Sequence, residues 1–354
     1  MWYGAGSIKL TKKVNFTLAP PLRAAALVAL VLTLSALAAG CGSSSSASGD
    51  GGGELSLVAY STPKEAYVEL IPAFQKTAAG KGVSFSQSFG ASGDQERAVE
   101  AGLPADVVAL SLQPDVDKLV DAGLVDAGWN MDRYDGFVTD SVVVLLVREG
   151  NPKGIHTWDD LVKPGVDVIS PNPFTSGGAK WNISAAYGAQ LEQGRSPGQA
   201  LDYVGRLFEN VSVLDKSARE ALQTFSSGKG DVLIAYENEA ITAREQGEDL
   251  EYVIPDQTIL IENPAAPVSS SKSPEKARAF VAFLHTPRAQ RIFASKGYRP
   301  VVEGLLDEKR FPSPPSLFEI GKLGGWSTVN DQLFDPEKGK IAEIFRDQGR
   351  STAG

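Results

Sequence analysis

The sequence has one cysteine and two histidines in 354 residues. A single cysteine, Cys41, excludes disulfide frameworks and cysteine-based zinc sites, because both need several cysteines. The two histidines, His156 and His285, lie far apart and form no HExxH pattern. The sequence therefore predicts no metal site and no cofactor, and it offers a cysteine protease no suitable nucleophile.

Positive charge is also scarce, since 34 Lys and Arg residues stand against 43 Asp and Glu residues and give a net charge of −9. Nucleic-acid backbones require clustered basic side chains, so this balance argues against a nucleic-acid partner. The composition of 42% hydrophobic and 22% charged residues is typical of a globular protein.

Long apolar runs are limited to residues 24–39, which follow four basic residues and no acidic ones. A run of this length is short for a membrane span and typical of a secretory signal. The small residues before Cys41 resemble the lipobox of bacterial lipoproteins, in which the cysteine is acylated. We expect residues 1–40 to be a signal peptide and Cys41 to be lipidated; a simple cleaved signal before an unmodified cysteine is the alternative.

Residues 41–53 continue with glycine and serine, a composition that forms flexible tethers and no core. Removing the four positive charges of residues 1–40 from a net charge of −9 gives −13. We therefore predict an extracytoplasmic protein that a lipid anchors to the outer face of the cytoplasmic membrane.

From residue 54 onward, short apolar runs alternate with amphipathic segments. This order predicts an α/β fold with mostly parallel sheets in two lobes. Strands are predicted at 55–60, 83–88, 106–110, 141–147, 166–170, 211–214, 231–236 and 258–261. Helices are predicted at 63–79, 96–101, 114–122, 181–190, 218–226 and 273–295.

Three predicted strand-to-helix junctions carry small residues, at 90–94, 172–179 and 215–219. Free N–H groups at the start of a helix, together with its dipole, attract anions, and small side chains let an anion approach. Taken alone, each junction is better explained by ordinary helix capping. Because ligands of α/β proteins bind at the carboxyl ends of strands, the three junctions together predict a shared oxyanion site.

At these junctions the chain resembles the sulfate-binding proteins of bacterial ABC sulfate importers, over most of residues 55–300. The resemblance is densest in NPKGIHTWDDLVKPGVDVISPNPFTSGGAKWN (151–182), VSVLDKSAREALQTFSSGKGDVLIAYENEA (211–240) and QSFGASGDQ (87–95). It implies a type II periplasmic-binding-protein fold with the ligand in a cleft between lobes. We expect lobe 1 to comprise residues 54–143 and 259–354, and lobe 2 residues 144–258.

The resemblance also implies the ligand-binding residues. The positions that match the family's binding residues are Ser61, Ser92, Ser176, Gly177, Gly178, Ala218 and Tyr236. Tyr236 replaces a tryptophan donor of the family, and Ser61 replaces an aspartate. The loss of that negative charge favours an oxyanion and leaves a change of ligand, such as thiosulfate, open.

A pocket of amides and hydroxyls suits sulfate, which carries no proton at neutral pH and only accepts hydrogen bonds. The resemblance predicts a monomeric, non-enzymatic lipoprotein that captures sulfate or thiosulfate and delivers it to the permease subunits of an ABC importer. Another tetrahedral oxyanion, molybdate or phosphate, is the alternative ligand. A serine hydrolase is the remote alternative, because SxxK occurs at 61–64, 269–272 and 273–276 without a KTG element.

Overall fold

The computed structural model describes residues 53–352. The predicted signal peptide, the lipidation at Cys41 and nearly all of the tether lie outside the described residues. Within residues 53–352 no helix combines the length and the apolar character needed to cross a membrane.

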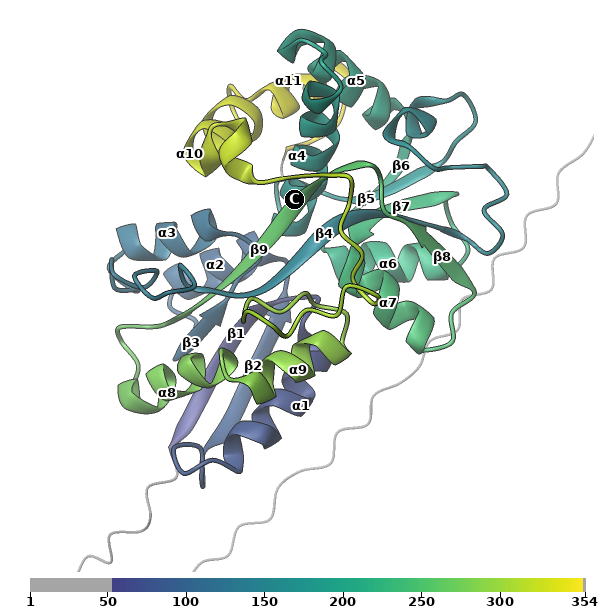
Figure 1. Cartoon of the computed structure of the whole chain (residues 1–354). Coiled ribbons are helices and arrows are strands. Elements are labelled where there is room, and N and C mark those ends of the chain that lie inside the picture. The colour runs from purple at the N-terminus through teal and green to yellow at the C-terminus, as the bar shows by residue number, and fades with distance from the viewer. Residues whose placement is uncertain (1–52, 353–354) are drawn as a thin grey trace, which may run out of the picture. The chain divides into compact units, whose positions relative to one another are not determined.

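The described chain alternates strands and helices, as the sequence predicts (Figure 1). The strands are β1 (Glu54–Tyr60), β2 (Ser84–Gly90), β3 (Val107–Ala109), β4 (Phe137–Arg148), β5 (Val168–Pro171), β6 (Val211–Asp215), β7 (Val232–Tyr236), β8 (Leu250–Val253), β9 (Gln257–Pro267) and β10 (Ser316–Phe318). The helices are α1 (Lys64–Gln75), α2 (Ser92–Glu100), α3 (Gln113–Asp121), α4 (Gly177–Glu192), α5 (Pro197–Asn210), α6 (Ala218–Ser226), α7 (Glu237–Glu245), α8 (Pro274–Leu284), α9 (Pro287–Ser295), α10 (Gly325–Val329) and α11 (Lys340–Asp347).

The strands form one hydrogen-bonded network in the order β2-β1-β3-β9-β4-β7-β5-β6. The outer groups are parallel, since β1 pairs with β2 and β3, and β5 pairs with β6 and β7. The long strands β9 and β4 join the two groups through antiparallel pairs with β3, with each other and with β7. The fold is therefore a mixed α/β fold, in which the outer groups are parallel as predicted and the joining strands are antiparallel.

Two large apolar clusters lie on the two groups of strands. The first cluster packs α1, α8 and α9 against β1 and includes Tyr67, Phe74 and Phe280. The second cluster packs α4 and α5 against β4, β5 and β7 and includes the buried side chains of Trp158 and Trp181. We call β1–β3 with α1, α2, α3, α8 and α9 the first group of elements, and β5–β7 with α4–α7 the second group. Strands β4 and β9 pass between the two groups (Figure 1).

The last helix, α11, packs in the second cluster. The ring of Phe345 lies 4.8 Å from the ring of Phe208 on α5, and Arg350 donates hydrogen bonds to the carbonyls of Phe208 and Val211. The predicted lobe boundaries remain a prediction. These contacts favour a division that assigns the C-terminal helices to lobe 2, whereas the sequence interpretation placed all of residues 259–354 in lobe 1.

Several predicted elements differ from the observed ones. Helix α1 ends at Gln75, α2 already begins at Ser92, and residues 273–295 form two helices that are broken before Pro287. The prediction omitted α5, α7, β8 and β10, and it gave no bounds for helices after residue 295. Helix α5 carries a local signal that could have identified it, because Ser196 and Gln199 form a capping box around Pro197.

Candidate functional site

The first turn of α4 is the centre of the candidate site. It follows β5 through a loop in which the Asn172 side-chain oxygen accepts the N–H of Phe174 at 2.9 Å, and the Asn172 carbonyl accepts the N–H of Ser176 at 2.8 Å. Ser176 caps the helix, because its hydroxyl oxygen accepts the N–H of Ala179. Gly177 and Gly178 form the buried first turn, and no acidic side chain lies in that turn. Their N–H groups have no carbonyl one turn earlier to bind, so this helix end can bind an anion.

Gly178 lies where three of the predicted binding residues meet. A Cβ atom added to Gly178 would lie 3.4 Å from Oγ of Ser176, 3.6 Å from Cβ of Ala218 and 3.6 Å from Cε1 of Tyr236. These residues begin α4, begin α6 and end β7, respectively. The convergence that the sequence predicted for two of the three junctions is therefore present around a residue without a side chain.

Helix α6 supplies the second helix start. Ser217 caps it through a hydrogen bond from the N–H of Glu220, and Ala218 is its first residue. Arg219 reaches across to the first group of elements, where it donates to the carbonyl of Thr62 at 3.1 Å and to Glu65 on α1 at 2.6 Å. The half-buried Ser61 is next to Thr62 in the chain, so this contact joins the Ser61 segment to the residue after Ala218.

The first turn of α2 supplies the third helix start, and its groups are already engaged. The buried Ser92 hydroxyl donates to Asp115 at 2.7 Å and accepts the N–H of Ser111 at 2.9 Å. The N–H of Gly93 donates to the carbonyl of Thr175, in the loop before α4, at 3.2 Å. A direct role of Ser92 in anion binding stays a prediction. Because its hydroxyl is engaged, the donor that Ser92 offers to an anion is its main-chain N–H.

Tyr236 ends β7, and its hydroxyl lies 2.7 Å from the hydroxyl of Ser111. Burial, the largest cause, raises the pKa of Tyr236 well above its usual value, so the phenol stays neutral and keeps its proton. The sequence interpretation did not include Ser111. It follows β3, whose carboxyl end lies at the same edge as that of the neighbouring parallel strand β1, and this shared edge is the signal that could have identified it.

Charged side chains surround the site as ion pairs between the two groups of elements. Lys216, next to the α6 cap, pairs with Asp94 on α2 at 2.8 Å, and Arg219 pairs with Glu65. The buried Glu239 in the first turn of α7 has a pKa raised from 4.5 to about 7, chiefly by desolvation, while the charge of Arg219 lowers it. These ion pairs connect the helix starts of the two groups. Arg219 is the cationic side chain in the first turn of α6, and it points to Thr62 and Glu65.

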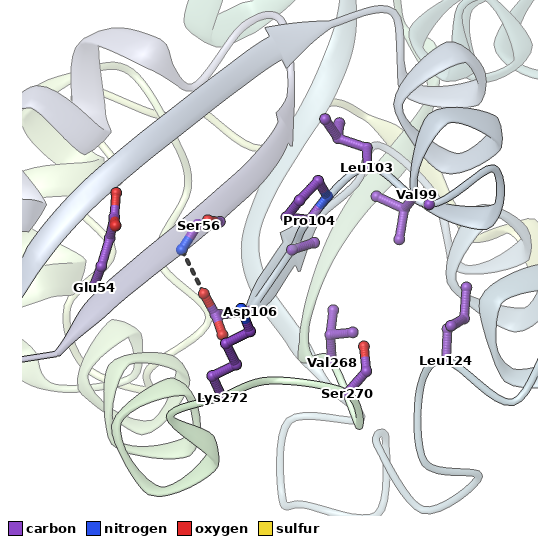
Figure 2. A pocket seen from close by; sticks show the side chains of 12 residues that line it. Glu54, Ser56, Val99, Leu103, Pro104, Asp106, Leu124, Val268, Ser270 and Lys272 are labelled. Atoms are coloured by element: carbon purple, nitrogen blue, oxygen red, sulfur yellow. Dashed lines mark hydrogen bonds between the residues drawn. The ribbon is translucent and has the colours of Figure 1, made fainter.

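A separate cavity of about 360 Å³ lies at the opposite end of β1. Figure 2 shows Glu54, Ser56, Leu103, Asp106 and Lys272 around it. The carboxylate of Asp106 accepts the N–H of Ser56 at 2.7 Å, so the Asp106 side chain is held in the cavity wall by β1. The cavity is formed at the beginning of β1, whereas Tyr60 and the segment of Ser61 lie at its carboxyl end, and it is therefore distinct from the candidate site.

The chain is similar to known extracellular binding proteins. Residues 55–299 match the family described as bacterial extracellular solute-binding protein. The sulfate-binding protein of Synechococcus elongatus is 43% identical over 292 residues, which cover 79% of this chain and 83% of that protein. The thiosulfate-binding protein of Pseudomonas aeruginosa is 36% identical over 305 residues, with 79% of this chain and 91% of that protein covered.

A solved structure gives the same result for the fold. The sulfate-binding protein SubI of Mycobacterium tuberculosis H37Rv has 45% sequence identity and a TM-score of 0.78, and the match covers 80% of this chain and 99% of that chain. The predicted type II periplasmic-binding-protein fold is confirmed. The chain belongs to the bacterial extracellular solute-binding proteins, in the family that includes the sulfate-binding proteins.

Proposed function

We propose that this protein captures sulfate outside the cytoplasm and delivers it to the permease of an ABC importer. The observation that carries the proposal is the convergence of Ser176, Ala218 and Tyr236 around the bare backbone of Gly178. The sulfate-binding relatives and the thiosulfate-binding relative support this class of ligand. We include thiosulfate as a second ligand of the same site.

The chemistry of the donors favours sulfate over phosphate. Sulfate only accepts hydrogen bonds at neutral pH, whereas hydrogen phosphate also needs an acceptor in its site. The buried carboxylate nearest to Ser92 is Asp115, and it already accepts the Ser92 hydroxyl and lies 3.8 Å from the Lys118 ammonium. Main-chain N–H groups of α4 and α6, with the hydroxyls of Ser176 and Tyr236, therefore supply donors for an acceptor-only dianion.

The strength of such a site follows from a small number of charged hydrogen bonds. Each contributes about 1.5–3 kcal/mol, and micromolar affinity corresponds to about −8 kcal/mol. Three to five such bonds are of the required size. Because the chain is acidic overall, the long-range field repels anions, and affinity has to come from these local donors.

Capture and release would follow from movement of the two groups of elements about β4 and β9. The hydrogen bond from Gly93 to Thr175 and the ion pairs of Lys216 and Arg219 connect the two groups beside the candidate site. Closure would thus bury the anion, and separation of these contacts at the permease would release it. We propose that the protein acts as a monomer and without catalysis.

Calorimetric titration of the purified protein tests the proposal. Sulfate is expected to bind with micromolar or tighter affinity, thiosulfate to compete, and phosphate and molybdate to bind at least tenfold more weakly. A folded protein that gives no heat with sulfate or thiosulfate would contradict the proposal. Mass spectrometry of the protein purified from membranes tests the proposed lipid at Cys41, which would anchor it to the outer face of the cytoplasmic membrane.

A further inference from the structure

Ser111 is a buried residue with every polar group engaged by a different element. Its N–H donates to the hydroxyl oxygen of Ser92, and its carbonyl accepts from Nε1 of Trp181 at 2.9 Å and from Nδ2 of Asn263 at 2.8 Å. Its hydroxyl lies 2.7 Å from that of Tyr236. Contacts with α2, α4, β9 and β7 thus fix the position of one serine.

The two hydroxyl groups of Ser111 and Tyr236 have one proton more than their mutual hydrogen bond uses. Ser111 and Tyr236 carry one hydroxyl proton each, and only one proton can lie between the two oxygens. The neighbouring Asn263 is engaged elsewhere, because its Oδ1 accepts the Tyr60 hydroxyl at 2.9 Å and its Nδ2 donates to the Ser111 carbonyl. The Ser111 carbonyl already accepts two hydrogen bonds. The pair is thus left with one proton for a third group.

The positions of the two residues indicate where that third group lies. A Cβ atom added to Gly177 would lie 3.1 Å from Oγ of Ser111, and one added to Gly178 would lie 3.6 Å from Cε1 of Tyr236. The hydroxyl pair therefore stands beside the first turn of α4, where the N–H groups of that helix are also available. A dianion bound there would accept the remaining proton of the pair.

We infer that Ser111 is a positioning residue of the oxyanion site, whose hydroxyl bond to Tyr236 fixes one O–H donor toward the first turn of α4. This inference rests on the proposed function. Ser111 belongs to the first group of elements and Tyr236 to the second, so the donor is correctly placed only when the two groups are together. The hydrogen bond thereby links closure of the protein to completion of the donor set.

A double-mutant cycle measured by calorimetry with sulfate tests the inference. The variants are Ser111→Ala, Tyr236→Phe and the double variant. Each single variant is expected to lose about tenfold in affinity, the size of one charged hydrogen bond. The double variant is expected to be within about twofold of the weaker single variant, because either change alone removes the positioned donor.

The matched control is Ser141→Ala. Ser141 is a buried serine on β4 whose hydroxyl bonds Asn238, and its loss is expected to change the melting temperature without changing sulfate affinity. If Ser111→Ala does not yield folded protein, Ser111→Cys keeps the volume with a weaker donor. Ser111→Cys is then expected to weaken sulfate binding by less than Ser111→Ala would when Tyr236 is present. In the Tyr236→Phe variant, Ser111→Cys is expected to cause no further loss of affinity.

The outcomes separate this inference from the proposed function. Full affinity in folded Ser111→Ala, or losses that multiply in the double variant, would overturn the positioning role while sulfate binding by the unmodified protein stands. Absence of sulfate binding by the unmodified protein would overturn the proposed function and the inference with it. A coupled loss confined to the two residues supports both.

Discussion

Helices α4 and α2 begin with similar sequences, but the residues of their first turns make different contacts. Each starts after a strand with serine and glycine, Ser176-Gly177-Gly178 in one case and Ser92-Gly93 in the other. In α4 the serine caps its own helix, and Gly178 faces Ala218 and Tyr236. In α2 the serine donates to Asp115, and the glycine N–H donates to the loop before α4.

The difference lies in the charges and partners that surround each helix start. The first turn of α2 contains Asp94, and the buried carboxyl groups of Glu96 and Asp115 lie close to Lys118. The first turn of α4 has no acidic residue. A negative charge at a helix start satisfies the same N–H groups and dipole that an anion would use. The start of α2 thus connects the two groups of elements, whereas the proposed anion site lies at the start of α4.

Gly178→Ala is expected to remove most of the anion binding that we propose for the start of α4. The added Cβ would make ordinary contacts of 3.4–3.6 Å with protein atoms, so the melting temperature should change by less than about 2 °C. The methyl group would occupy the space between Ser176, Ala218 and Tyr236, and sulfate affinity should fall by about 100-fold, the size of one to two charged hydrogen bonds.

The matched control is Gly198→Ala in α5, where an added Cβ would meet no atom within 4 Å. Calorimetric titration and scanning calorimetry on both variants provide the measurements. Sulfate binding by Gly178→Ala that equals binding by Gly198→Ala would show that the anion does not lie at this glycine.

The alternation of apolar runs was sufficient to predict the α/β order, because buried strands and amphipathic helices leave periodic patterns. The pairing of β4 with β9 and β7 could not be predicted in this way. A continuous apolar run such as 141–147 fits a buried strand of either direction. Its partners β7 and β9 lie about 90 and about 120 residues further along the chain. The antiparallel joining strands are therefore a property of the tertiary fold.

The residues of the candidate site were predictable where small residues follow strands. They were less predictable where their hydrogen-bond partners come from distant parts of the chain. Ser176, Gly178 and Ala218 stand at helix starts that local sequence identifies. The engagement of Ser92 by Asp115 depends on α3, which lies 23 residues further along the chain. Ser111 carries no capping pattern. Its position after β3 places it at the right edge of the sheet, but its pairing with Tyr236 is visible only in the structure.

Comparing Ser176→Ala with Ser92→Ala sharpens the contrast between the two helix starts. Ser176→Ala removes a helix cap and a hydroxyl donor, so affinity for sulfate should fall by about tenfold, with a cost in unfolding free energy of about 1 kcal/mol. Ser92→Ala leaves the buried Asp115 carboxylate and the Ser111 N–H without their partner, which should cost about 1–3 kcal/mol. Its sulfate affinity should fall by less than about threefold.

Chemical denaturation and calorimetric titration separate the two variants. The expected pattern is a larger affinity loss in Ser176→Ala and a larger stability loss in Ser92→Ala. The reverse pattern would assign the anion to α2 instead of α4.

Glu239 extends the comparison to a third helix start, that of α7, through the pH dependence of stability. The carboxyl group is 2% exposed, and its pKa is raised from 4.5 to about 7, chiefly by desolvation. A carboxyl group with a raised pKa in the folded state contributes stability that is fully present below its unfolded pKa and is lost as the pH rises through about 7. Glu239→Gln removes this titration, so the melting temperature of the variant minus that of the unmodified protein should increase by about 5–10 °C between pH 5 and pH 8, which corresponds to roughly 2.5 kcal/mol. Scanning calorimetry at both pH values measures the difference, with Glu343→Gln on the exposed face of α11 as the control that leaves it unchanged. Equal changes in melting temperature in Glu239→Gln and Glu343→Gln would mean that Glu239 is ionised throughout this pH range and that Arg219 offsets its burial. The start of α7 would then be electrostatically similar to that of α2.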